Sequence, residues 1–158
     1  MKVTLSIPRP SNKSYTVSGK SIREVFDALQ KHGWWGRYRS NEGMSYSGKS
    51  STVDTIKVSA SPVIFMPSWT GYSKASKAEQ QSWDKMYKAL KKHEENHHEI
   101  FLSSADDWKK EMEKNGNLSE KDTKAAWSDF TKATQKKQDA YDTKTDHGQK
   151  EGVILDLP

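Results

Sequence analysis

The sequence predicts an α+β domain in which a small N-terminal antiparallel sheet with one helix packs on a long C-terminal helical hairpin. Residues 1–71 alternate polar and apolar side chains between glycine and proline turns, which is typical of strands. Residues 76–115 and 119–141 instead repeat apolar side chains at helical spacing. No linker or internal repeat divides the chain, so we expect a single domain over residues 1–158.

Strands are expected where β-branched and aromatic residues alternate with polar ones. Two short N-terminal strands are indicated by Val3, Leu5 and Ile7, and then by Tyr15 and Val17. Further strands of the antiparallel sheet are expected within residues 53–66, which are rich in valine and isoleucine.

Each expected helix begins with a serine followed three residues later by an acidic residue, which is a helix-capping pattern. The serines are Ser21, Ser76 and Ser119. Gly33 ends the first helix, and Asn115 with the glycine after it ends the second. We expect the third helix to end where Tyr141 begins a polar segment that continues to Gly148.

Composition limits the possible functions. The longest apolar run has four residues, whereas a membrane span needs about 20, so no span is expected. The chain has no cysteine, which leaves histidine and carboxylate as the zinc ligands. The net charge of +5 comes from residues 1–71, and a basic balance alone predicts no specific nucleic-acid partner.

The stretch His93-Glu94-Glu95-Asn96-His97 matches the HExxH motif of zinc hydrolases. Histidines four residues apart on a helix differ by about 40° in direction, so both rings can reach one Zn²⁺. Glu94 would lie beside the metal and act as the catalytic base. Glu94 and His97 also fall on the apolar stripe of the helix, where an unpaired charge would be unfavourable. The sequence therefore predicts a zinc site here.

A catalytic zinc usually has a third protein ligand and an open position. The helix extends about 27 Å beyond His97, and a return helix of the same length brings residues 141–148 back beside the motif. His147 is the favoured third ligand, and Asp142 and Asp146 remain alternatives. Asp142 could instead accept the free N–H of a zinc-bound histidine. Tyr141 is a candidate catalytic residue that would donate its hydroxyl to a developing oxyanion.

Three motifs resemble a bacterial domain family of predicted secreted zinc-dependent proteases. They are a Tyr-x-Val-x-Gly start (15–19), a Pro-x-Trp leading into a helix with HExxH (67–97), and a closing Tyr-Asp-x-x-Thr-x-His-Gly (141–148). The resemblance implies a zincin-like peptidase with His93, His97 and His147 as zinc ligands. It also implies a secreted or periplasmic protein. The N-terminal residues lack the apolar stretch of a signal peptide, which leaves cytoplasmic location or non-classical export open.

The predicted function is therefore hydrolysis of peptide bonds by zinc-activated water. Expected partners are protein or peptide substrates, with cell-envelope material as a further candidate, and a strand from residues 53–66 could pair with an extended substrate. Two alternatives remain: a zinc amidase acting on cell-wall peptides, and a helical interaction module without catalysis.

Overall fold

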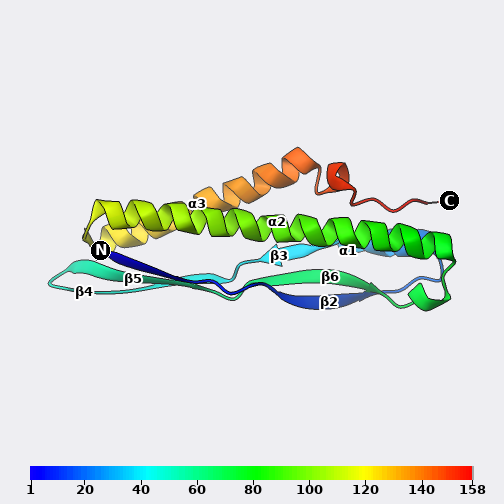
Figure 1. The fold of residues 1–158 in the computed structure, drawn as a ribbon, viewed down its shortest axis with the longest axis horizontal. Helices are drawn as coiled ribbons and strands as arrows, with labels where there is room; N and C mark the ends of the chain where they lie inside the picture. Colours follow the sequence, from blue (N-terminus) through cyan, green and yellow to red (C-terminus); the bar gives the residue numbers. More distant parts are fainter. Residues whose placement is uncertain (158) are drawn as a thin grey trace.

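The computed structural model describes residues 1–157 and shows an α+β fold arranged along one long helix, α2 (Lys77–Asn115). Its 39 residues span roughly 58 Å at about 1.5 Å per residue. Figure 1 shows the strands along one side of α2. Helix α3 (Glu120–Thr145) starts beside the end of α2 and diverges from it toward the C-terminus. The predicted α+β class and the pairing of two long helices are confirmed.

The strands form two sheets that lie end to end along α2 (Figure 1). The first has the order β1 (Lys2–Ser6), β5 (Thr52–Ala60), β4 (Glu42–Lys49), and the short β7 (Leu118–Ser119) also pairs with β5. The second has the order β2 (Ser11–Val17), β6 (Val63–Trp69), β3 (Arg37–Arg39).

The prediction of an antiparallel sheet is wrong, because both sheets are mixed. β4 and β5 are antiparallel neighbours joined by a tight turn at Ser50 and Ser51, both of which have positive φ. β1 pairs with β5, and β2 with β6, in parallel. The chain returns to these two strands only after long crossovers, which permit parallel pairing. Alternation in a sequence reveals which residues share a face, but it carries no information on strand direction.

The helix boundaries follow the capping signals. The Ser21 side chain accepts from the Glu24 N–H at the start of α1 (Ile22–His32), and Gly33 ends α1 with a φ of 89°. Ser76 and Ser119 are the N-caps of α2 and α3. None of the helices within residues 1–157 combines the length and the apolar composition that crossing a bilayer requires.

One boundary differs from the prediction, since α3 continues as far as Thr145. Tyr141 and Asp142 therefore belong to the last turns of the helix and not to a break that starts at Tyr141. The chain turns only after Thr145, where Asp146, His147 and Gly148 all have positive φ. A short 3₁₀ turn, η2 (Gln149–Glu151), follows.

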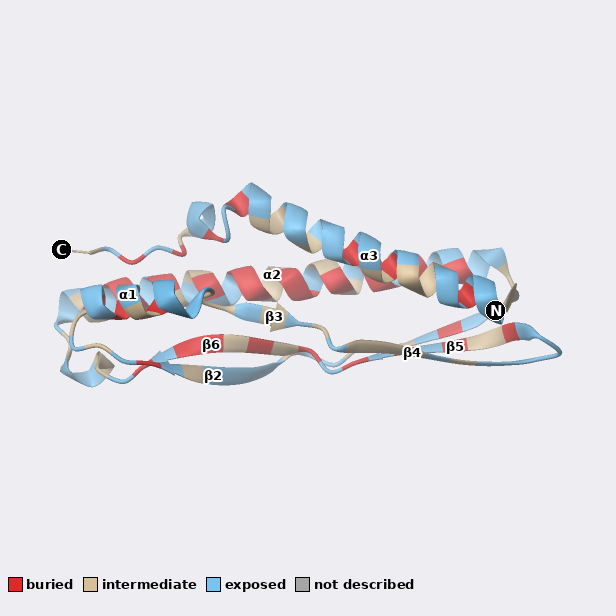
Figure 2. Ribbon diagram, turned by 180° about the vertical axis from the view of Figure 1, so that it is seen from behind, coloured by how far each residue is buried: buried red, intermediate tan, exposed pale blue. Residues whose placement is uncertain are grey.

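Apolar side chains form two clusters that share α2. The first joins α1, the second sheet and the N-terminal half of α2, with Ile64, Met66 and Met86 among its buried members. The second joins the first sheet, α3 and the C-terminal half of α2, with Phe101 and Phe130 among its members. Figure 2 shows buried positions along the whole length of α2. The HExxH stretch lies between the two clusters.

Candidate metal centre

Helix α2 places three side chains of the HExxH stretch on its covered face. His93, Glu94 and His97 are only 3%, 4% and 7% exposed. Their spacing of one and four residues puts them within about 100° of arc on the helix. β3 and α3 cover this face of α2, so the polar side chains are held in a largely dry environment.

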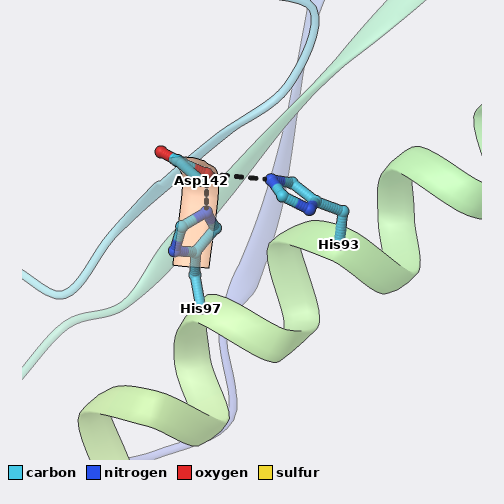
Figure 3. A group of neighbouring side chains, drawn as sticks. All are labelled: His93, His97 and Asp142. Atoms are coloured by element: carbon cyan, nitrogen blue, oxygen red, sulfur yellow. Dashed lines mark hydrogen bonds and ion pairs between the residues drawn. The ribbon is translucent and has the colours of Figure 1, made fainter. Parts of the chain in front are cut away.

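Asp142 on α3 completes a group of possible metal ligands. Its Oδ1 lies 3.1 Å from His93 Nε2 and 2.9 Å from His97 Nε2. In Figure 3 both rings project from α2 toward this carboxylate. The three ligand atoms all lie within 4.8 Å of one another. The structure thus brings together the two predicted histidines and one of the alternatives for the third ligand.

The other nitrogen of each ring faces a second acceptor. His93 Nδ1 lies 2.8 Å from Glu151 Oε2, and His97 Nδ1 lies 2.5 Å from Gln138 Oε1. The orientation of the Gln138 amide follows from its Nε2, which donates to the His97 backbone carbonyl at 2.9 Å. Both Nδ1 atoms are therefore N–H donors, and both Nε2 atoms point at Asp142.

The two rings face more acceptors than neutral imidazoles can satisfy. A neutral histidine carries one N–H, yet each ring here has an acceptor at both nitrogens. Burial lowers the pKa of His93, but hydrogen bonds to Asp142 and Glu151 outweigh it and raise that pKa. Burial raises the pKa of Asp142, and hydrogen bonds from both histidines lower it much further. The group therefore favours positive charge between Asp142 and the Nε2 atoms.

A zinc ion matches this donor set. Zinc binds imidazole nitrogen and carboxylate oxygen at about 2.0–2.2 Å, so its tetrahedral ligand atoms are about 3.3 Å apart. The observed nitrogen–oxygen separations of 3.1 and 2.9 Å are close to this value. Acceptors on the second nitrogen of each ring are the usual outer partners of metal-bound histidines. The residues present fit the metal that the sequence predicts.

Glu94 lies beside this group and is buried. Burial raises the pKa of its carboxyl to about 7, although the charges of His97 and His93 act to lower it. The Tyr38 backbone N–H donates to the carboxylate. Gly36 leaves room for the same side chain, because a Cβ there would lie 2.7 Å from Glu94 Oε1. Glu94 is thus held where it can exchange a proton near neutral pH.

The cluster opens into a cleft of about 970 Å³ between β3, α2, α3 and the C-terminal segment.

A model of the family described as a bacterial protein of unknown function, DUF922, matches residues 12–148. The chain belongs to this family. No curated protein and no solved structure matches it. The match includes the HExxH stretch, Asp142 and the closing motif of the DUF922 chain, whereas Glu151 lies just beyond it.

His147, the favoured third ligand, lies outside the group of ligand atoms. Its side chain is 79% exposed, and its Nδ1 is 3.9 Å from Asp142 Oδ2. Its backbone has a φ of 50°, which is uncommon for a residue with a side chain. Asp146 is exposed at the end of α3, where its backbone N–H caps the helix. Ligation by His147 remains a prediction, and the structure offers Asp142 in that position.

Tyr141 has two kinds of contact at the site. Its ring packs on His93, and its hydroxyl bonds to Asn96 and Glu151. The ring stacks on His93 at 4.9 Å between centroids. The hydroxyl accepts from Asn96 at 2.9 Å and donates to the Glu151 carboxylate at 2.8 Å. The single O–H of Tyr141 is therefore engaged, and donation to a substrate oxyanion would require this bond to open. The oxyanion role of Tyr141 remains a prediction.

Sequence reasoning did not identify Gln138 and Glu151 as site residues. Gln138 lies four residues before Asp142 on α3, so the helical spacing places both on the face that meets His97. That spacing was the available signal. Glu151 follows three residues with positive φ, and no local pattern predicts where such a turn directs a side chain.

Proposed function

We propose that this DUF922 chain is a mononuclear zinc hydrolase that cleaves peptide bonds. The main support is the convergence of His93 Nε2, His97 Nε2 and Asp142 Oδ1, with each Nδ1 already bonded to another acceptor. Such an arrangement is favourable when a cation lies among the three atoms. His93, His97 and Asp142 would hold the zinc, and His147 is the alternative to Asp142.

When bound, zinc would supply a water of lowered pKa and would polarise the substrate carbonyl. Glu94 would accept a proton at its carboxylate and return it to the nitrogen of the departing amine. A pKa of about 7 suits both steps, because the group can gain and lose a proton near neutral pH. Glu151 and Gln138 would keep both rings in the tautomer that leaves Nε2 free.

An extended substrate can be placed along β3. The expectation that a strand from residues 53–66 provides the pairing edge is wrong, because β5 and β6 lie inside their sheets. β3 is an edge strand of its sheet, and its residues line the cleft. The Tyr38 N–H already points away from β6 to Glu94. A peptide added at this edge would therefore lie across the metal-binding residues.

The test combines zinc content with hydrolysis. Elemental mass spectrometry should find about one zinc per wild-type chain, and His97→Ala and the isosteric Asp142→Asn should lose it. Glu94→Gln should keep the zinc and lose roughly 10²–10⁴-fold in hydrolysis of an unfolded protein substrate. Full hydrolysis by Glu94→Gln would contradict the proposed role of Glu94.

Other outcomes separate the alternatives. Zinc that is lost in His147→Ala but kept in Asp142→Asn would make His147 the third ligand. Hydrolysis of purified peptidoglycan without hydrolysis of unfolded protein would indicate the cell-wall amidase. A wild-type chain that binds no zinc after supplementation would contradict the enzyme proposal and favour the interaction module.

A further inference from the structure

The cleft differs in character on the two sides of the metal-binding residues. Apolar side chains predominate at one end, where Gln30 of α1 also lines the cleft: Phe26, Trp35, Leu90, Val153, Ile154 and Leu155. The other end is lined by polar ones, among them Ser40, Asn41, Thr131, Thr134 and Gln135. A ligand that spans the cleft would meet an apolar surface on one side of Glu94 and hydrogen-bonding groups on the other.

The C-terminal segment forms one wall of the apolar end. It runs from the cluster toward the start of α2, because Gly152 lies beside Ala89 and the Asp156 N–H donates to Ser82 Oγ at 2.8 Å. Val153 and Leu155 are buried, at 4% and 5% exposed. This end of the cleft therefore lies on the Leu90 side of His93.

Ile154 lies between these two buried residues, but its own side chain is not buried. It is 52% exposed and is the only exposed large apolar side chain within residues 1–157. It shares the lining of the cleft with Phe26 and Trp35, whose rings meet edge to face at 6.0 Å. Apolar surface left open inside a cleft is typical of a ligand subsite.

The polar end lies beyond His97 along α2. Its α3 residues come one to two turns before Gln138. Thr134 lines this end and is only 7% exposed. Its hydroxyl has no hydrogen-bond partner within the described residues 1–157. A buried hydroxyl without a partner is unfavourable, and a polar group of a ligand that reached it would supply the missing hydrogen bond.

The direction of β3 sets how a peptide would lie between the two ends. Gly36 lies against Leu90 and Glu94, whereas the Tyr38 hydroxyl bonds to His98 Nδ1 at 3.0 Å, one turn further along α2. β3 thus runs from the apolar end to the polar end. A peptide paired antiparallel to β3, the more stable arrangement, would run from the polar end to the apolar end. The residue after the cleaved bond would then meet Ile154.

We propose that the apolar end of the cleft, lined by Ile154, Trp35 and Phe26, is a subsite for a large apolar side chain immediately C-terminal to the cleaved bond. The substrates are peptides with leucine, isoleucine, methionine or phenylalanine at that position. The placement of the subsite immediately after the cleaved bond rests on the proposed function. Binding of an apolar side chain at this end of the cleft does not.

Cleavage of a synthetic octapeptide mixture by the zinc-loaded wild-type chain tests the position. Mass spectrometry of the new N-termini should show apolar first residues about 10-fold above their frequency in the mixture. Ile154→Lys should remove this preference, and the matched Ile154→Val should keep it. Because Ile154 is half exposed, neither change should unfold the chain. A preference on the other side of the bond, or one unchanged by Ile154→Lys, would overturn the proposal.

A binding measurement tests the subsite without turnover. N-acetyl-leucine amide should shift the NMR signals of Ile154 and Trp35 at concentrations about 10-fold lower than N-acetyl-glycine amide. Ile154→Lys should abolish the difference. Leucine-selective shifts in a chain that hydrolyses nothing would keep the subsite and reject the peptidase, whereas equal responses to both probes would reject the subsite.

Discussion

At the scale of single residues, the cluster depends on side chains outside the HExxH motif. Glu151 contacts both His93 Nδ1 and the Tyr141 hydroxyl, at 2.8 Å in each case. Glu151 therefore selects the tautomer of His93, and it also holds the Tyr141 ring in its stacked position on His93. Outer partners of this kind typically change metal affinity by about 10–100-fold.

Replacing Glu151 by alanine should weaken zinc binding by about 10–100-fold, because the Nε2 atom of His93 would no longer be held ready as a ligand. Competition with a chromogenic chelator measures the zinc dissociation constant. Glu111→Ala is the matched control, since that glutamate is exposed on α2 at a distance from the cluster. An unchanged dissociation constant in Glu151→Ala would show that the contact does not orient His93.

At the scale of elements, one carboxylate connects the starts of two helices. Glu79 Oε1 accepts from the Ile22 N–H of α1 at 2.9 Å, and Oε2 accepts from the Ser76 N–H at the start of α2 at 3.0 Å. These hydrogen bonds, first that from Ile22, lower the pKa of Glu79 below 4.5. The charge also suits the positive ends of both helix dipoles.

Glu79→Gln should lower the Tm at neutral pH, because it removes the charge that caps both helices. A carboxyl whose folded pKa is lowered contributes stability above its unfolded pKa, and that contribution is lost as the pH falls through the folded pKa. The Tm difference from wild type should therefore be fully present above pH 4.5 and shrink below it. Calorimetry from pH 7 to pH 3 measures this difference. A difference that grows on acidification would contradict the assignment.

At the scale of the whole molecule, the metal centre lies where two cores meet along α2. Met86 is fully buried in the first core and Phe101 is 1% exposed in the second. The intervening turns carry His93, Glu94 and His97, so the geometry of the cluster depends on both cores being folded. A continuous helix through both cores should couple them into one cooperative unit.

Met86→Ala and Phe101→Ala should each lower the Tm of a single transition, by amounts that correspond to about 2–5 and 3–5 kcal/mol of unfolding free energy. Far-UV circular dichroism would follow the helices and near-UV dichroism the tryptophans of both cores. The two signals should give the same midpoint in each variant. Separate midpoints, with only one core affected by each substitution, would show that α2 does not couple the cores.

Local features of the sequence determined the helix starts and two of the three candidate metal ligands, His93 and His97. Ser21, Ser76 and Ser119 mark helix starts because a cap depends on hydrogen bonds within four residues. His93 and His97 share a helix face because their spacing matches the helical repeat. Both kinds of information are contained in a short stretch of chain.

The tertiary structure decided what those local features meet. Asp142 faces the two histidines from the last turns of α3, which remains helical to Thr145. Glu151 reaches His93 after a turn of residues with positive φ, and β3 becomes an edge strand beside Glu94 because it pairs antiparallel with β6, a strand far along the chain. These contacts depend on packing between segments that are far apart in the chain. The spacing of residues within one segment carries no information about such packing.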